Sequence, residues 1–219
     1  NEEFMDEWVA LMKSRAGERG IFNHGGLLSQ LPARRIKEWE RTRYLVNGRI
    51  NGQPGTNPCG EIILKSKQFC NLTEIIARST DTKQTLLRKA RLATILGTYQ
   101  STLTDLPYLS KEWKVNCEAE RLLGVSVTGQ WDSPESRDGD TLAALREETI
   151  ATNKKYAKRF GINQSTAITC VKPSGTVSQT FDVSSGMHAR HAPYYIRRIR
   201  VSATDSLFKL MRDQGVPYY

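Results

Sequence analysis

The sequence lacks several features that would assign it to a simple class. It has no apolar run of membrane-spanning length, so we expect no membrane partner. Its first residues, from Asn1 to Phe4, contain neither an initiator methionine nor the basic-then-apolar layout of a signal peptide. We therefore expect a cytoplasmic protein, and a chain that starts inside a longer polypeptide.

Metal-binding and structural disulfide patterns are also missing. Three histidines are too few and too scattered for a zinc site, so no metal is expected. His188 and His191 lie three apart, but Pro193 disfavours a shared helical face and favours polar loop histidines. Without a secretory signal, thiols are expected to be reduced or redox-active. The chain has four cysteines, none in a Cys-x-x-Cys pair: Cys59, Cys70, Cys117 and Cys170.

The charge is unbalanced in the basic direction, with a formal net charge of +9 over 219 residues. Such a balance favours partners that carry negative charge, such as nucleotide phosphates, nucleic acid or acidic lipid. The basic residues are spread along the chain without interleaved aromatics, which argues against nucleic acid as a partner. Arg197, Arg198 and Arg200 fit a solvated strand face better than a phosphate-binding stripe.

Helical and extended patterns alternate along the chain, which is typical of an α/β fold. A dense cluster of turn formers occupies residues 51–58, and there is no repeat, low-complexity tract or linker, so one domain is expected over 1–219. The patterns predict helices at 3–15, 34–45, 82–104, 140–160 and 203–214, and strands at 62–64, 123–129, 165–171 and 194–201.

A first candidate site lies in the turn-rich segment. Asn57, Cys59 and Glu61 place an amide, a thiol and a carboxyl at alternate positions. In an extended loop, residues two apart point the same way, so one patch would present all three groups to a ligand. The alternative is a simple turn with one buried cysteine and an exposed glutamate.

A second candidate site follows the strand predicted at 165–171. The turn around Ser174, Gly175 and Thr176 leaves backbone N–H groups free to converge on an anion. A following helix would add its N-terminal dipole. The alternative is a strand-to-helix turn with a serine cap.

Several segments together resemble the ribonucleotide reductases. Residues 57–62 with 70–72 are similar to the family's active-site loop, and 172–178 to its substrate-phosphate loop. Residues 120–130 and 185–200 also match, in family order, and 17–23 match more weakly. The resemblance implies part of a ten-stranded α/β barrel, with a finger loop at about 51–72 inside it.

The resemblance also implies roles for individual residues. Cys59 would become a thiyl radical that removes the 3′-hydrogen of the ribose, and Glu61 would accept the 3′-hydroxyl proton. Asn57 would hydrogen-bond the substrate hydroxyls. Cys70 would be one of two thiols that reduce the sugar and close to a disulfide. The substrate phosphates would be bound by Ser174, Gly175, Thr176, Val177 and Ser178.

The short separation of Cys59 and Cys70 resembles that in monomeric adenosylcobalamin-dependent triphosphate reductases. The sequences of residues 172–176 and 194–200 are similar to the same enzymes. This implies adenosylcobalamin, a ribonucleoside triphosphate and a thioredoxin-type reductant. Cys117 and Cys170 do not match the place of the second reducing cysteine. The chain is thus expected to be a fragment, a split-gene product or a degenerate copy. The alternatives are a reductase with a separate radical-generating subunit, a basic nucleic-acid-binding domain and a non-catalytic remnant.

Overall fold

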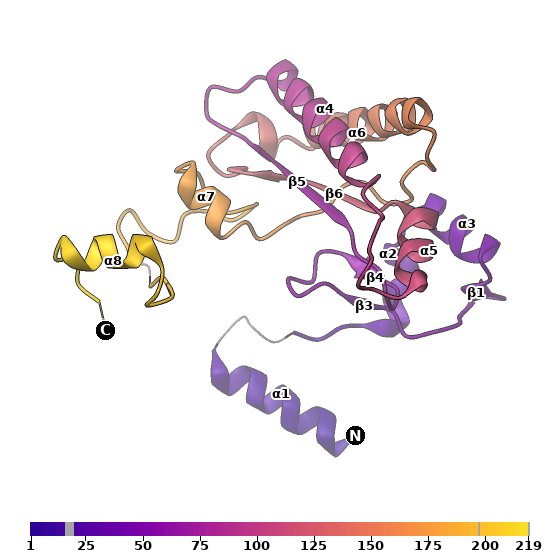
Figure 1. Ribbon diagram of the computed structural model, residues 1–219, viewed down its shortest axis with the longest axis horizontal. Coiled ribbons are helices and arrows are strands. Elements are labelled where there is room, and N and C mark those ends of the chain that lie inside the picture. Colours follow the sequence, from indigo (N-terminus) through magenta and orange to yellow (C-terminus); the bar gives the residue numbers. More distant parts are fainter. Residues whose placement is uncertain (16–19, 197, 219) are drawn as a thin grey trace. The chain divides into compact units, whose positions relative to one another are not determined.

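The computed structural model describes residues 1–15, 20–196 and 198–218, and shows an α/β protein (Figure 1). The chain divides into two compact units, residues 1–189 and 190–219. The elements of the first unit are α1 (Glu2–Ser14), η1 (His24–Gly26), α2 (Leu27–Gln30), α3 (Ala33–Arg41), β1 (Leu45–Val46), β2 (Arg49–Ile50), β3 (Gly55–Thr56), β4 (Ile63–Leu64), β5 (Asn71–Ile76), α4 (Lys83–Gln100), α5 (Lys111–Glu120), β6 (Leu123–Thr128), η2 (Glu135–Arg137), α6 (Gly139–Phe160) and α7 (Thr176–Thr180). The second unit contains α8 (Ser206–Asp213).

The centre of the first unit is a parallel pair of strands. β5 and β6 run side by side, with Asn71 opposite Leu123 and Ile76 opposite Thr128. A third parallel segment follows α6 and meets β6 through a bridge between Thr169 and Val125. The Val125 N–H also donates to the carbonyl of Ile168 at 2.8 Å. The order strand–helix–strand–helix–strand is that of consecutive βα units.

The two long helices α4 and α6 cover one face of these strands (Figure 1). Their apolar residues meet inward-pointing strand residues in one buried cluster. Alternation along the strands sends Leu123 and Val125 toward the helices and Gly124 to the opposite face. The buried cluster consists of Ile75, Ala77, Leu86, Ala90, Ala93, Leu123, Val125, Leu145 and Ile168.

The opposite face of the strands receives the segment that precedes them. A Cβ added at Gly124 would lie 2.5 Å from Leu72 Cδ2, 3.0 Å from Cys170 Sγ and 3.2 Å from Ile62 Cδ1. Gly124 therefore lets the end of the loop before β4 pack closely on the sheet. This contact puts the first candidate site on the face away from α4 and α6.

The five predicted helices are confirmed as α1, α3, α4, α6 and α8, with ends shifted by a few residues. α6 ends where expected, at Gly161, which has φ +67° and caps the helix in the left-handed conformation. In α8, the Asp205 carboxylate accepts a hydrogen bond from Leu207 N–H and caps the helix start.

Two strand predictions need correction. The run 165–171 is not a full strand, because only Thr169 forms a bridge, with Val125 of β6. Among the described residues of 194–201 there is no strand, since β-branched and aromatic residues alone do not supply a pairing partner. β5 and α5 were not predicted. None of the helices in the described ranges is both long and apolar enough to cross a membrane.

Candidate active site

The first candidate site is the loop of a β-hairpin. β3 and β4 pair antiparallel, with Gly55 opposite Leu64 and Thr56 opposite Ile63. The loop is closed by hydrogen bonds to Asn57. Its backbone N–H donates to Ile62 O at 3.1 Å, its side-chain Oδ1 accepts from Ile62 N–H at 2.9 Å, and its carbonyl accepts from Gly60 N–H at 2.9 Å. Asn57 therefore helps to hold the loop shape.

This loop turns sharply instead of running extended. Gly60 has φ +80°, a conformation that favours glycine. The expectation that Asn57, Cys59 and Glu61 share one direction by alternation therefore fails. Cys59 is exposed at the tip rather than in the interior, Asn57 is half-buried, and the Glu61 side chain is only 2% exposed.

Among the described residues, the buried Glu61 carboxylate forms one ion pair, with Lys172. Lys172 Nζ lies 3.6 Å from Glu61 Oε1, and neither carboxylate oxygen has a hydrogen-bond partner among the described residues. A buried carboxylate without hydrogen bonds is costly, because desolvation disfavours its charged form. Glu61 is thus held by an ammonium from the start of the second candidate site, far away in the sequence.

Cys70 lies beside this ion pair, immediately before β5, and is partly buried. Burial, and after it the Glu61 carboxylate, raise the pKa of the Cys70 thiol to about 11 against the opposing charges of Arg35 and Lys172. At neutral pH Cys70 is therefore a protonated thiol, the form that can give up hydrogen.

The structure adds Cys170 to this group, which was not assigned from the sequence. Burial, and after it the charges of Glu61 and Cys70, raise the pKa of Cys170 to about 12, while Lys172 opposes the shift. Cys170 lies across from Gly124, on the same strand face as Leu72. Alternation gave no signal for Cys170, because in a regular strand it would share the direction of Ile168.

The second candidate site, the phosphate loop (residues 172–178), is a tight turn that leads into the short helix α7. Ser174 has φ +43° and a buried hydroxyl without a hydrogen-bond partner in the described part of the chain. Its carbonyl accepts hydrogen bonds from the hydroxyls of Ser178 and Ser185. Ser178 is therefore committed to the loop itself, whereas Gly175, Thr176 and Val177 are exposed.

Residues 184–186 connect the phosphate loop to the carboxyl end of β6, since the Ser185 hydroxyl donates to the Ser174 carbonyl at 2.8 Å. The Gly186 N–H donates to Thr128 Oγ1 and the Gly129 N–H donates to Ser184 O, each at 2.9 Å. Gly186 has φ +55°, and a Cβ there would lie 2.7 Å from Lys172 O. In open parallel sheets, ligands bind beyond the carboxyl ends of the strands. The loop occupies such a position.

Within the described ranges, no three His, Cys, Asp or Glu side chains come together as a possible metal site. His188 and His191 are both exposed. Arg197 and residues 17–19 of the weaker match lie outside the described residues.

The sequence is similar to a set of known enzymes. The adenosylcobalamin-dependent ribonucleoside-triphosphate reductase of Lactobacillus acidophilus is 31% identical, over 74% of this chain and 25% of that protein. The enzyme of the same name from Levilactobacillus brevis is 29% identical, over 91% of this chain and 29% of that protein. No protein-family model matches.

A solved structure supports the fold. The class Id ribonucleotide reductase alpha subunit of Actinobacillus ureae aligns over 96% of this chain and 46% of its own, with a TM-score of 0.54 and 17% identity. By its sequence similarity, the chain is a homologue of ribonucleotide reductases. Its relatives are, more narrowly, adenosylcobalamin-dependent ribonucleoside-triphosphate reductases, and the chain spans about a quarter of their length.

Proposed function

We propose that this chain carries the radical and substrate-phosphate elements of an adenosylcobalamin-dependent ribonucleoside-triphosphate reductase. The observation that carries the proposal is the convergence of Glu61, Cys70 and Lys172. These residues come from the finger loop and the phosphate loop, two segments far apart in the sequence. The homologues' names support the same reaction.

Each residue type suits its step. The Cys59 sulfur, as a thiyl radical, takes the 3′-hydrogen of the ribose, because thiol hydrogen is weakly held and exchanges readily. Glu61 takes the proton of the 3′-hydroxyl, which becomes acidic once the carbon radical forms. Asn57 orients the substrate hydroxyls through its side-chain NH₂, since its oxygen already accepts from Ile62.

The electrons for the reduction come from thiols. The 2′-hydroxyl leaves as water and is replaced by hydrogen, while Cys70 and a second thiol lose two hydrogens and close to a disulfide. Cys59 then returns its hydrogen to the 3′-carbon. A thioredoxin-type protein would reduce the disulfide for the next turnover. The protonated state of Cys70 at neutral pH supports this role.

The substrate triphosphate is assigned to the phosphate loop. Ser174 to Ser178 would bind it mainly through backbone N–H groups, with Gly175, Thr176 and Val177 exposed to the ligand. We also propose that the strands here form part of the ten-stranded barrel of the family. The consecutive parallel βα units are consistent with that arrangement.

The residue that would meet adenosylcobalamin is Cys59. Its exposure at the tip of the hairpin leaves the thiol open to a cofactor of that size. The cofactor supplies a carbon radical through homolysis of its cobalt–carbon bond, and the protein's part is to position the thiol.

The test is a pair of substitutions in a full-length reductase that contains this segment, with adenosylcobalamin supplied. Cys59→Ser should abolish deoxynucleotide formation while substrate binding survives, because a serine O–H bond is too strong to yield its hydrogen. Cys70→Ser should still allow 3′-hydrogen removal but form no disulfide, and should therefore release free base from decomposed sugar.

Deoxynucleotide yield and base release are measured together, with Cys117→Ser as the matched control. Cys117 is buried in α5 and should tolerate the change without loss of turnover. A normal deoxynucleotide yield from Cys59→Ser would end the radical assignment.

A further inference from the structure

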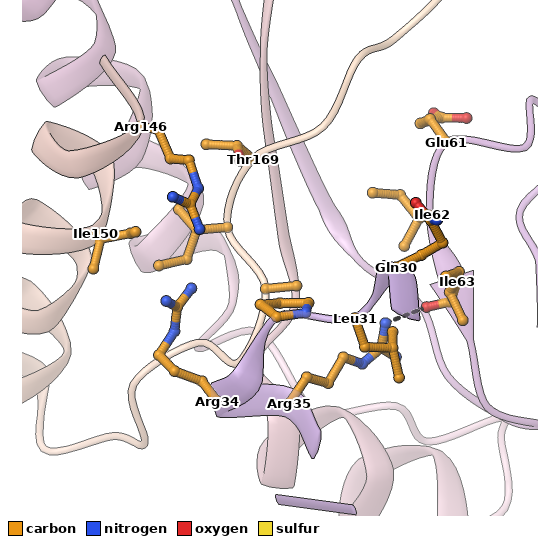
Figure 2. Close-up of a pocket in the computed structure, with 13 residues that line it drawn as sticks. Gln30, Leu31, Arg34, Arg35, Glu61, Ile62, Ile63, Arg146, Ile150 and Thr169 are labelled. Carbon is orange, nitrogen blue, oxygen red and sulfur yellow. Dashed lines mark hydrogen bonds between the residues drawn. The ribbon is translucent and has the colours of Figure 1, made fainter. Parts of the chain in front are cut away.

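A cavity of about 380 Å³ lies between the start of α3 and the middle of α6, and no role above uses its charged end. Arg34 reaches into it from α3 and Arg146 from α6. Ile150 and Ile168 provide an apolar wall, and Thr169 a hydroxyl. Figure 2 shows the two guanidinium groups pointing toward each other across the cavity.

The two arginines are poorly compensated by the protein. Arg34 Nε is buried with no hydrogen-bond partner among the described residues. Arg146 pairs at 3.4 Å with Glu147 on the same helix, and both side chains are exposed. Burial lowers the pKa of Arg34, the nearby Arg146 lowers it further, and Glu147 only partly opposes them. Arg34 therefore lies half-buried beside a second positive charge, that of the exposed Arg146.

The next residue on α3 shows what a satisfied arginine looks like here. Arg35 donates to Glu120 at 2.6 Å, to the Ile63 carbonyl at 2.7 Å and to Gln68 at 3.3 Å. The same helix thus gives the Arg35 guanidinium three acceptors and leaves Nε of its neighbour Arg34 without one among the described residues. An anion would supply acceptors to both Arg34 and Arg146.

We propose that the Arg34–Arg146 cavity binds the phosphate group of a small molecule. Arginines hold phosphate through charge-assisted and often bidentate hydrogen bonds. The start of α3 adds to the attraction. Its N-cap residue, Pro32, also lines the cavity and accepts from the Arg35 and Ile36 N–H groups, which leaves the N–H groups of Ala33 and Arg34 without an intrahelical acceptor.

This site is separate from the phosphate loop, although both would bind phosphate. Arg34 and Arg146 come from α3 and α6, whereas the loop comprises residues 172–178. Glu61 also lines the cavity, but its partner is Lys172. The two sites are distinguished by a chain that carries Gly175→Pro, in which the phosphate loop is disabled and the arginine cavity is intact.

The experiment measures binding of inorganic phosphate and pyrophosphate to the full chain at low ionic strength, by calorimetry and by the shift in Tm. We expect binding to persist in Gly175→Pro and to weaken about tenfold or more in Arg34→Gln and in Arg146→Gln, as loss of a charge-assisted contact predicts. Arg88→Gln, which removes the same charge from an exposed position on α4, should bind as the parent does.

A second readout separates a binding role from a structural one. In the absence of phosphate, Arg34→Gln and Arg146→Gln should each raise Tm, because they remove repulsion between like charges. A structural role predicts a lower Tm instead. Arg146 is exposed, so its variant should fold even if the Arg34 variant does not. Affinity unchanged within twofold in the Arg146 variant, or stabilisation by acetate equal to that by phosphate, would overturn the proposal.

Discussion

At the scale of single residues, the charge balance around Glu61 decides the state of the nearby thiols. Glu61 is buried and has one ammonium partner, Lys172, at 3.6 Å. Its negative charge raises the pKa of both Cys70 and Cys170, and the charge of Lys172 opposes the shift. The carboxylate and the ammonium therefore act on Cys70 in opposite directions, and each can be removed separately.

We predict that Glu61→Gln lowers the pKa of Cys70 from about 11, because a neutral amide no longer destabilises the thiolate. Lys172→Met should raise it, because the stabilising positive charge is lost. The measurement is the rate of alkylation against pH, followed by mass spectrometry on the tryptic peptide of residues 68–78, in which Cys70 is the one cysteine.

Cys117 provides the internal control, since its raised pKa is caused by burial first and Glu61 is not among its neighbours. Its alkylation profile should be unchanged in both variants. If the two substitutions shifted the pKa of Cys70 in the same direction, the carboxylate and the ammonium would not act on it in opposite directions.

At the scale of elements, the phosphate loop depends on backbone geometry more than on its side chains. Ser178 and Ser185 donate their hydroxyls to the Ser174 carbonyl and so maintain the turn. The exposed backbone of Gly175 to Val177 is what remains for a ligand. Substitutions in this loop should therefore differ according to whether they change a side chain or the backbone.

We predict that Ser174→Ala weakens triphosphate binding modestly, while Gly175→Pro weakens it strongly. Proline removes a backbone donor and restricts the chain, whereas alanine removes only one hydroxyl. Titration calorimetry with a ribonucleoside triphosphate measures both, in a chain with Arg34→Gln so that the arginine cavity does not contribute. Equal and small effects would argue against a backbone-built phosphate site.

Much of the element order follows from local pattern. The helices at α4 and α6 combine an apolar face with clear ends, such as the Gly161 cap, and these signals are local. β5 was missed because Asn71, Thr73 and Glu74 interrupt its apolar pattern, and only pairing with β6 makes it a strand. The segment 165–171 has strand composition, yet one bridge is all that it forms.

The candidate site was only partly visible in the sequence. The motifs located Cys59, Glu61, Cys70 and the phosphate loop, but not the contact between Glu61 and Lys172, which depends on the packing of the hairpin against the sheet. Local spacing also suggested an extended loop at 57–61, whereas hydrogen bonds to Asn57 close it into a turn. Contacts between distant segments are the part that local pattern does not encode.

At the scale of the whole first unit, one buried carboxylate joins four segments that position the site. Glu120, at the end of α5, accepts from Arg35 and Lys65, each at 2.6 Å, and from Trp39 Nε1 at 2.9 Å. Thr166 donates to it at 3.2 Å. Arg35 and Trp39 lie on α3, Lys65 follows the hairpin, and Thr166 precedes the third parallel segment.

We predict that Glu120→Gln destabilises the protein by about 3–5 kcal/mol at neutral pH, because it leaves the buried charges of Arg35 and Lys65 without a counter-charge. Burial favours the neutral carboxyl, but the two cations outweigh it and hold the pKa of Glu120 below its ordinary value of 4.5. Its ionised form therefore stabilises the fold above pH 4.5, and this contribution is lost as the pH falls through the lowered pKa. In denaturant unfolding, the free energy of unfolding should be much lower for the variant than for the parent at pH 7, and this difference should become smaller in acid.

The control is Glu112→Gln, which removes an exposed partner of Lys67 and should lower the free energy of unfolding by less than about 1 kcal/mol. If the loss of stability in Glu120→Gln did not change with pH, the ion pairs of Glu120 would not be its cause.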